Sequence, residues 1–220
     1  MKTGLISLAY ELNMLFDRET KKRVREILQT QAIPPKYNEG VNKGYYKKMV
    51  MRYVIASYFS RDKTVLDCGC CLGWGSYIMS KNAKKVIGID IQEDHIEFAK
   101  SSYGNKENLS FIKGDIINLD KYVRGSFDIV TSMEVIEHLE EKDCANFVQK
   151  VHNLLSDGGL FIVSSVFAKD YLTAEKILSA SCSHNRHIYT KDEWRDMLRR
   201  IGFARTFFLG WKAFSKKGKT

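Results

Sequence analysis

The stretch VLDCGCCLGWGS, residues 65–76, decides how the rest of the chain is interpreted. A short apolar run ends at Asp67, and three glycines follow at Gly69, Gly73 and Gly75. A glycine-rich turn between a strand and a helix brings backbone N–H groups close to a bound ligand. The same stretch carries three cysteines, which raises the alternative of a metal or redox site. The two interpretations predict different proteins.

Short apolar runs alternate with amphipathic segments from residue 64 onward. The helical segments are GSYIMSKN (75–82), EDHIEFAKSSYG (93–104) and ANFVQKVHNLLSDGG (145–159). Continuous Val/Ile/Leu runs between helices indicate a parallel sheet with both faces covered. The pattern predicts a doubly wound, Rossmann-like α/β fold. The expected strands are TVLDCG (64–69), KKVIGIDI (84–91), LSFIKGDI (109–116), SFDIVTSM (126–133) and GLFIVSSV (159–166).

The two ends of the chain differ from this alternation. Residues 1–60 are predicted to form an N-terminal helical cap, and residues 61–166 the ligand-binding core of a single domain over 1–220. Residues 167–220 are expected to hold a substrate-side insert and a closing hairpin. In that region Thr190 and Glu193 form a capping-box pattern before a helix. The aromatic runs around Gly210 predict a reversed last strand, and hence a mixed, seven-stranded sheet.

The charge of the chain indicates which classes of partner it could bind. The net charge is +9 over 220 residues, so a nucleic acid or another anionic partner is possible. The N-terminus does not have the pattern of a signal peptide, and no apolar run is long enough to cross a membrane. A cytoplasmic location is expected.

Acidic residues end three of the predicted strands. Asp67 ends the first, Asp90 the second and Asp115 the third. Asp90 lies about 20 residues past the first glycine, where a carboxylate accepts hydrogen bonds from ribose hydroxyls. Asp115 is placed to accept from an adenine amino group. Asp67 at the head of the loop disfavours a pyrophosphate and favours an ammonium group, so the sequence predicts an adenosine ligand with a cationic tail.

These motifs together resemble the class I S-adenosylmethionine-dependent methyltransferases. The similarity is carried by VLDCGCCLGWGS, VIGIDI, FIKGDI, FDIVTSMEVIEHL and LLSDGGLFIVSS, in that order, over residues 64–166. It implies S-adenosylmethionine as the cofactor and S-adenosylhomocysteine as the product. It implies that Asp67, Gly69 and Gly73 line the methionine moiety and that Asp90 holds the ribose. It implies further cofactor contacts at Ile91, Asp115, Ile116, Met133 and Glu134.

Two positions near the cofactor raise separate questions. Cys71 stands where the family usually has a glycine, so the backbone path of the loop there is uncertain. The segment RYVIASYFSRDKTVLD, which begins at Arg52, resembles bacterial members that modify glycans and small metabolites. Arg52 is therefore either a partner of the cofactor carboxylate or an exposed helix residue.

The cysteines do not have the spacing of a zinc site. Zinc ligands usually come in C-x₂₋₄-C pairs with a second pair or histidines at a distance. C-x-C-C inside the loop has no such second pair. We expect these cysteines to be small buried side chains.

A second cluster follows the fourth strand in SMEVIEHLEE. Glu134, Glu137 and His138 are spaced i, i+3 and i+4, so on a helical turn they would share one face. They form a structural helix start, or His138 is a general base oriented by a carboxylate, or the three bind a divalent cation. EVIEHL resembles the ubiquinone-biosynthesis O-methyltransferases and the small-RNA 2′-O-methyltransferases, where such residues bind metal. A divalent metal is thus possible but not predicted.

The other histidines have less specific predicted roles. His187, with His184, precedes the helix that starts after Thr190 and borders the substrate pocket in related enzymes, or else caps that helix. The predicted catalytic set is His138, Glu137 and His187. His95 and His152 are predicted to be helix-surface residues without a function.

The predicted activity is methyl transfer to a small molecule or a sugar, most often at a hydroxyl. One alternative is an RNA methyltransferase of the 2′-O type, with or without the assistance of a metal, which the charge favours. Others are a small-molecule N-methyltransferase and a non-catalytic cofactor-binding protein.

Overall fold

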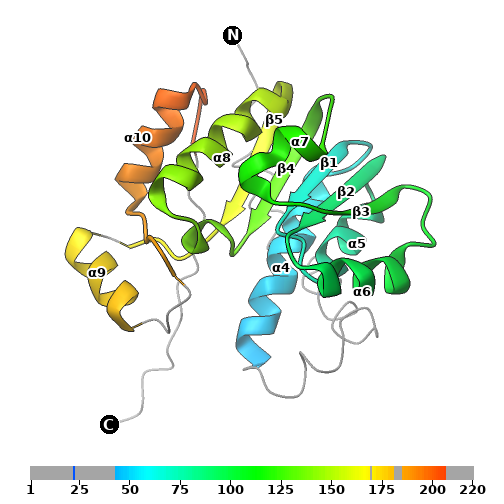
Figure 1. The fold of residues 1–220 in the computed structure, drawn as a ribbon, viewed down its shortest axis with the longest axis horizontal. Helices are drawn as coiled ribbons and strands as arrows, with labels where there is room; N and C mark the ends of the chain where they lie inside the picture. The colour runs from blue at the N-terminus through cyan, green and yellow to red at the C-terminus, as the bar shows by residue number, and fades with distance from the viewer. Residues whose placement is uncertain (1–21, 23–42, 169, 181–184, 207–220) are drawn as a thin grey trace.

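The computed structural model describes residue 22 and residues 43–168, 170–180 and 185–206 (Figure 1). Within these described residues, five strands form one sheet in the order β3-β2-β1-β4-β5, and every neighbouring pair is parallel. The α/β sheet predicted from the apolar runs is confirmed. The strands are β1 (Thr64–Cys68), β2 (Lys85–Asp90), β3 (Leu109–Lys113), β4 (Phe127–Met133) and β5 (Leu155–Ser164).

Helices cover both faces of this sheet, as expected (Figure 1). Alternate strand residues point to opposite sides. Val65 and Val86 therefore pack in one core cluster with α4, α5 and α6, whereas Leu66 and Ile89 pack in the other with α8 and α10. The helices are α4 (Lys43–Phe59), α5 (Trp74–Ser80), α6 (Glu93–Tyr103), α7 (Leu119–Tyr122), α8 (Glu141–Leu154), α9 (Tyr171–Ala180) and α10 (Lys191–Ile201), with 3₁₀ turns η1 (Ile116–Asn118) and η2 (Ile136–His138).

The boundary between α8 and β5 was predicted wrongly. The expected helix ran through residue 159, but α8 ends at Leu154 and β5 begins at once. Leu155 pairs with Phe127, and the register shifts between this pair and that of Ile129 with Leu160. Gly158, with φ 78°, lies within the shifted segment. Strand pairing at the sheet edge, which is not visible in helical periodicity, overrides the local pattern here.

The predicted start of α10 after Thr190 is confirmed. Thr190 caps α10 by accepting a hydrogen bond from the Glu193 N–H, and the Glu193 side chain returns to the Thr190 N–H. Gly202 ends the helix in the left-handed conformation. Residues 1–42 of the predicted N-terminal cap, apart from residue 22, and most of the predicted closing hairpin lie outside the described residues, and so do the sixth and seventh strands of the expected sheet.

Candidate functional site: the cofactor loop and the strand ends

Parallel strands place the predicted ligand residues at one edge of the sheet. The loop between β1 and α5 leaves this edge with Gly69 at φ 75° and Gly73 at φ 79°. A Cβ on Gly73 would lie 2.6 Å from the Ala99 Cβ and 2.7 Å from the Phe111 ring. Position 73 therefore requires glycine for both its backbone angle and its space. The loop is also tied to the next strand, because the Gly69 and Cys70 N–H groups both donate to the Ile89 carbonyl.

Cys71 follows the path expected of the glycine it replaces. Its φ is 49°, in the left-handed region that glycine favours. Its N–H donates to Asp90 Oδ2 at 2.8 Å. The loop thus keeps a left-handed turn at this position, and the backbone bears the strain of a side chain there.

Asp90 is held in place by the backbone on both sides. Oδ2 accepts from Cys71, and Oδ1 accepts from the Gln92 N–H at 2.9 Å. A carboxylate has about four lone-pair positions, so two remain for further donors. Asp90 is 8% exposed, at the end of β2. These two free positions fit the two hydroxyls of a ribose.

The sequence reasoning missed a neighbour of Asp90. His95 Nδ1 lies 3.4 Å from Asp90 Oδ1, within reach of an ion pair if the imidazole is protonated. The Nδ1 atom is buried and is not aligned for a hydrogen bond. His95 follows Asp90 by five residues, so it turns back to the strand end from the first turn of α6. That spacing was the only available signal.

Asp67 is fully buried at the base of the loop. Oδ2 accepts from Ser76 Oγ at 2.6 Å, and Oδ1 accepts from Thr131 Oγ1 at 2.7 Å. Burial raises the pKa of Asp67 from its ordinary 3.8 to about 6, although both hydroxyls oppose the shift. Asp67 therefore links β1, α5 and β4 directly beneath the glycines.

The residues predicted to frame an adenine lie around the next strand ends. Asp115 caps η1 by accepting from the Ile117 N–H at 2.9 Å. Ile116 is buried, whereas Ile91, next to Asp90, is 61% exposed. An exposed isoleucine beside the ribose carboxylate offers an apolar surface for a flat base.

Glu134 and Arg52 form an ion pair across the end of β4. Arg52 Nη1, from α4, lies 3.0 Å from Glu134 Oε1, which also accepts from Ser164 Oγ. Glu134 has φ 57°, and its N–H donates to the Ser164 carbonyl. Met133, just before it, is buried. Arg52 is therefore one-fifth exposed and engaged by Glu134 rather than free on the helix surface.

The predicted shared face of Glu134, Glu137 and His138 was wrong. The left-handed Glu134 precedes a single 3₁₀ turn, so the three residues are not on one helical turn. Glu137 turns inward and is 4% exposed, while His138 is exposed. Backbone geometry after a strand end, rather than residue spacing, sets these directions.

Glu137 is a buried carboxyl at the ends of β4 and β5. Its Oε2 accepts from Ser165 Oγ at 2.8 Å. Burial raises the pKa of Glu137, and the charge of Glu134 adds to the shift. The Glu137 carbonyl accepts from the Arg186 N–H and ties the segment before α10 to this edge. Ser164, the last residue of β5, bonds Glu134, and Ser165 bonds Glu137, a pairing that the sequence reasoning did not find.

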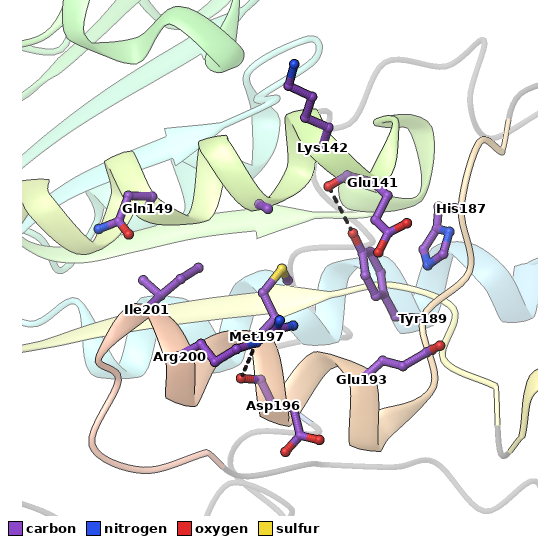
Figure 2. A pocket seen from close by; sticks show the side chains of 11 residues that line it. Glu141, Lys142, Gln149, His187, Tyr189, Glu193, Asp196, Met197, Arg200 and Ile201 are labelled. Carbon is purple, nitrogen blue, oxygen red and sulfur yellow. Dashed lines mark hydrogen bonds between the residues drawn. The ribbon is translucent and has the colours of Figure 1, made fainter.

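The side chain of His187 lies apart from that of Glu137, although the His187 N–H donates to the Glu137 carbonyl at 3.4 Å. It lines a groove of about 650 Å³ between α8 and α10, where its ring contacts Tyr189 at 4.3 Å between centroids (Figure 2). Tyr189 donates to the Glu141 carbonyl in the same groove. None of the residues that line this groove belongs to the glycine loop. The structure therefore separates His187 from Glu137 and His138 by side-chain surroundings, and His184 lies outside the described residues.

The cysteines and the acidic residues do not form a metal centre in the described chain. Cys68 and Cys70 are buried as expected, and burial raises the pKa of both thiols. Cys71 is half-buried. Among residues 22, 43–168, 170–180 and 185–206, no three His, Cys, Asp or Glu side chains are grouped to hold a metal ion.

Comparison with known families identifies the chain. Residues 59–202 match a family described as methyltransferase domain, which spans the loop, the strand ends and α10. The chain belongs to the methyltransferase domain family. S-adenosylmethionine is the cofactor of this class, and Asp90 with its two free acceptor positions fits the ribose.

Curated methyltransferases are similar in sequence to part of this chain. A probable S-adenosylmethionine-dependent methyltransferase of Mycolicibacterium smegmatis is 27% identical over 55% of the chain and 45% of its own length. The ajmaline N-methyltransferase of Rauvolfia serpentina is 27% identical over 64% and 45%. The ubiquinone biosynthesis O-methyltransferase of Coxiella burnetii is 30% identical over 53% and 49%. The chain spans about half the length of the curated relatives it matches.

A solved structure has the same fold. The YcgJ protein of Bacillus subtilis superposes with a TM-score of 0.61 over 68% of this chain and 67% of its own, at 23% identity. At that identity the likeness concerns the fold alone. The helices in the described ranges include none that is long and apolar enough to span a bilayer.

Proposed function

We propose that this methyltransferase transfers the methyl group of S-adenosylmethionine to a hydroxyl of a small molecule or sugar. The observation that carries the proposal is Glu137, a buried carboxyl with a raised pKa at the ends of β4 and β5. A hydroxyl must lose its proton as it attacks, and a base with a pKa moved toward neutrality suits that task.

The cofactor supplies a sulfonium-bound methyl group. We assign its ribose to Asp90 and its adenine to the surface of Ile91, Asp115 and Ile116. Gly69, Cys71 and Gly73 form the backbone around its methionine moiety, above Asp67. Met133 and Glu134 border the reacting end, where the Arg52 guanidinium balances the Glu134 charge.

The acceptor oxygen would attack the methyl carbon as the carbon–sulfur bond breaks. Glu137 would take the acceptor's proton as the carbon–oxygen bond forms, and the cofactor would be left as S-adenosylhomocysteine. Ser165 Oγ holds Oε2 of Glu137 and so fixes the direction of the carboxyl. Much of the acceleration would come from this positioning, because the donor is already activated.

His138 is the second candidate for the base. Its exposed side chain lies one residue from Glu137, and it serves if the acceptor approaches from solvent. His187 would then contact only a part of the acceptor that extends into the α8–α10 groove. The names of the Coxiella and Rauvolfia relatives support small-molecule acceptors and leave oxygen and nitrogen as alternatives.

The test compares Glu137→Gln with Glu141→Gln, which changes an exposed glutamate at the start of α8. Labelled methyl transfer into fractionated hydroxyl metabolites and glycans identifies the acceptor first. Glu137→Gln should then lower kcat by roughly 100-fold or more, with unchanged cofactor affinity. Full activity of Glu137→Gln, together with loss in His138→Ala, would assign the base to His138 instead. Labelling of amine acceptors alone would refute the hydroxyl assignment.

A further inference from the structure

The amino-terminal edge of the sheet, opposite the cofactor loop, gathers basic residues from three separate segments. Backbone hydrogen bonds join them, since Lys84 N–H donates to the Lys63 carbonyl and Asp62 N–H to the Asn82 carbonyl. Asn108 Nδ2 bonds the carbonyls of Ser80 and Ala83. The segments are 61–63 before β1, 81–85, which ends at the first residue of β2, and 104–108 before β3.

We name this surface the amino-edge patch; its cations are Arg61, Lys63, Lys81, Lys84, Lys85 and Lys106. All but the half-buried Lys106 are exposed. The carboxylates of the same segments are Asp62, Glu107 and, across from β1, Asp128, which is engaged by the Thr64 N–H. In the part of the chain that is described, Lys63, Lys84 and Lys85 form no ion pair. The patch therefore has an uncompensated positive charge.

Aromatic rings lie among these cations. Lys81 Nζ and Lys106 Nζ lie 5.0 and 5.6 Å from the centre of the Tyr77 ring, which stacks on Tyr103. Tyr58, at the end of α4, is 37% exposed and close in sequence to Arg61. The end of α4 is held to α5 through Asn82, which donates to Ser57. The exposed Tyr58 ring, three residues before Arg61, offers base stacking, and the lysines of the patch offer phosphate contacts.

We propose that the amino-edge patch binds single-stranded nucleic acid, with phosphates on its lysines and a base on Tyr58. The exposed charged side chains there are mainly cations, with Asp62 and Glu107 among them, and Tyr58 is the exposed ring, whereas a membrane-binding surface would present larger apolar groups. The carboxyl edge is one strand length away, about 20 Å for strands of this size. A strand of several nucleotides would be long enough to reach from the patch to the cofactor edge, although the proposal does not require it to be methylated.

The test measures binding of a fluorescein-labelled 12-nucleotide RNA to the full chain by anisotropy, from 50 to 200 mM KCl. With about four phosphate contacts, affinity should fall roughly 50-fold over this range, since the slope for single strands is about 0.7 per contact. The triple variant Lys81→Glu, Lys84→Glu, Lys85→Glu should bind at least 10-fold more weakly at 50 mM KCl and show a shallower salt slope. Tyr58→Ala should weaken binding with an unchanged slope.

A matched control makes the same charge change elsewhere. Lys121→Glu, Lys142→Glu and Arg200→Glu reverse three exposed cations on α7, α8 and α10. This control should retain most of the affinity, and both triple variants should keep wild-type thermal midpoints and cofactor binding. The proposal is overturned if RNA does not bind at 50 mM KCl or if the two triple variants lose affinity equally. Binding of phosphatidylserine vesicles without binding of RNA would also overturn it.

Discussion

Asp90 Oδ2 accepts a hydrogen bond from the Cys71 N–H at 2.8 Å, which joins the end of β2 to the turn of the cofactor loop. The carboxylate thereby fixes the loop at the residue where glycine was expected. The same bond orients Asp90, so the loop and the proposed ribose contact depend on each other.

Asp90→Ala should abolish measurable S-adenosylmethionine binding in calorimetry. The change removes both the proposed ribose acceptors and the partner of the Cys71 N–H. Asp94→Ala, at an exposed position in the first turn of α6, is the control and should bind as the wild type does. An unchanged affinity in Asp90→Ala would disprove the pocket assignment.

Cys71→Gly should stabilise the fold by roughly 0.5–1 kcal/mol, because glycine accepts φ 49° without strain. Thermal or urea unfolding measures the change. Cys71→Ala keeps the Cβ and loses the thiol, so it should show no such gain. If alanine stabilised the protein as much as glycine, the thiol and not the backbone angle would be the source of the effect.

The raised pKa of Asp67 predicts that the folded protein loses stability as the pH rises. Its folded pKa of about 6 is above the ordinary 3.8, so between these values the folded state binds a proton more tightly than the unfolded state. The contribution of Asp67 to the free energy of unfolding is greatest below about pH 4. It falls by about 3 kcal/mol by the time the pH has risen past 6. Urea unfolding from pH 4 to 7.5 should show this fall in the wild type, compared with Asp67→Asn. Parallel curves for the two proteins would show that Asp67 is not the titrating group.

Arg52 allows a test with two ligands. If it contacts the cofactor carboxylate, Arg52→Gln should weaken S-adenosylhomocysteine binding by roughly 10-fold, since a charge-assisted hydrogen bond is lost. Binding of 5′-methylthioadenosine, which has no carboxylate, should not change. Equal losses for both ligands would mean that Arg52 acts through the structure of the site.

The partner of Arg52 is tested separately. A double-mutant cycle with Arg52→Gln and Glu134→Gln should give a coupling of about 1 kcal/mol in unfolding free energy, because the pair is largely buried. A coupling near zero would show that the observed ion pair does not contribute to stability.

Much of the fold followed from local sequence. The strand ends at Asp67 and Asp90, the glycine turn and the Thr190 cap depend on residues close together in the chain, and all were predicted. The α8–β5 boundary was not, because the pairing of Leu155 with Phe127 joins distant segments. Most of the predicted cap before residue 43 and the closing hairpin after residue 206 lie outside the described residues.

The candidate site divides in the same way. The sequence by itself determined the family, the cofactor loop and the carboxylates at the strand ends, because each is a local motif with a required backbone shape. Only the tertiary structure decided that Glu137 is buried against Ser165 and that His187 faces another groove. It alone brought the lysines of three segments together at the amino edge. Those features depend on how loops far apart in the chain pack, which spacing along the sequence does not specify.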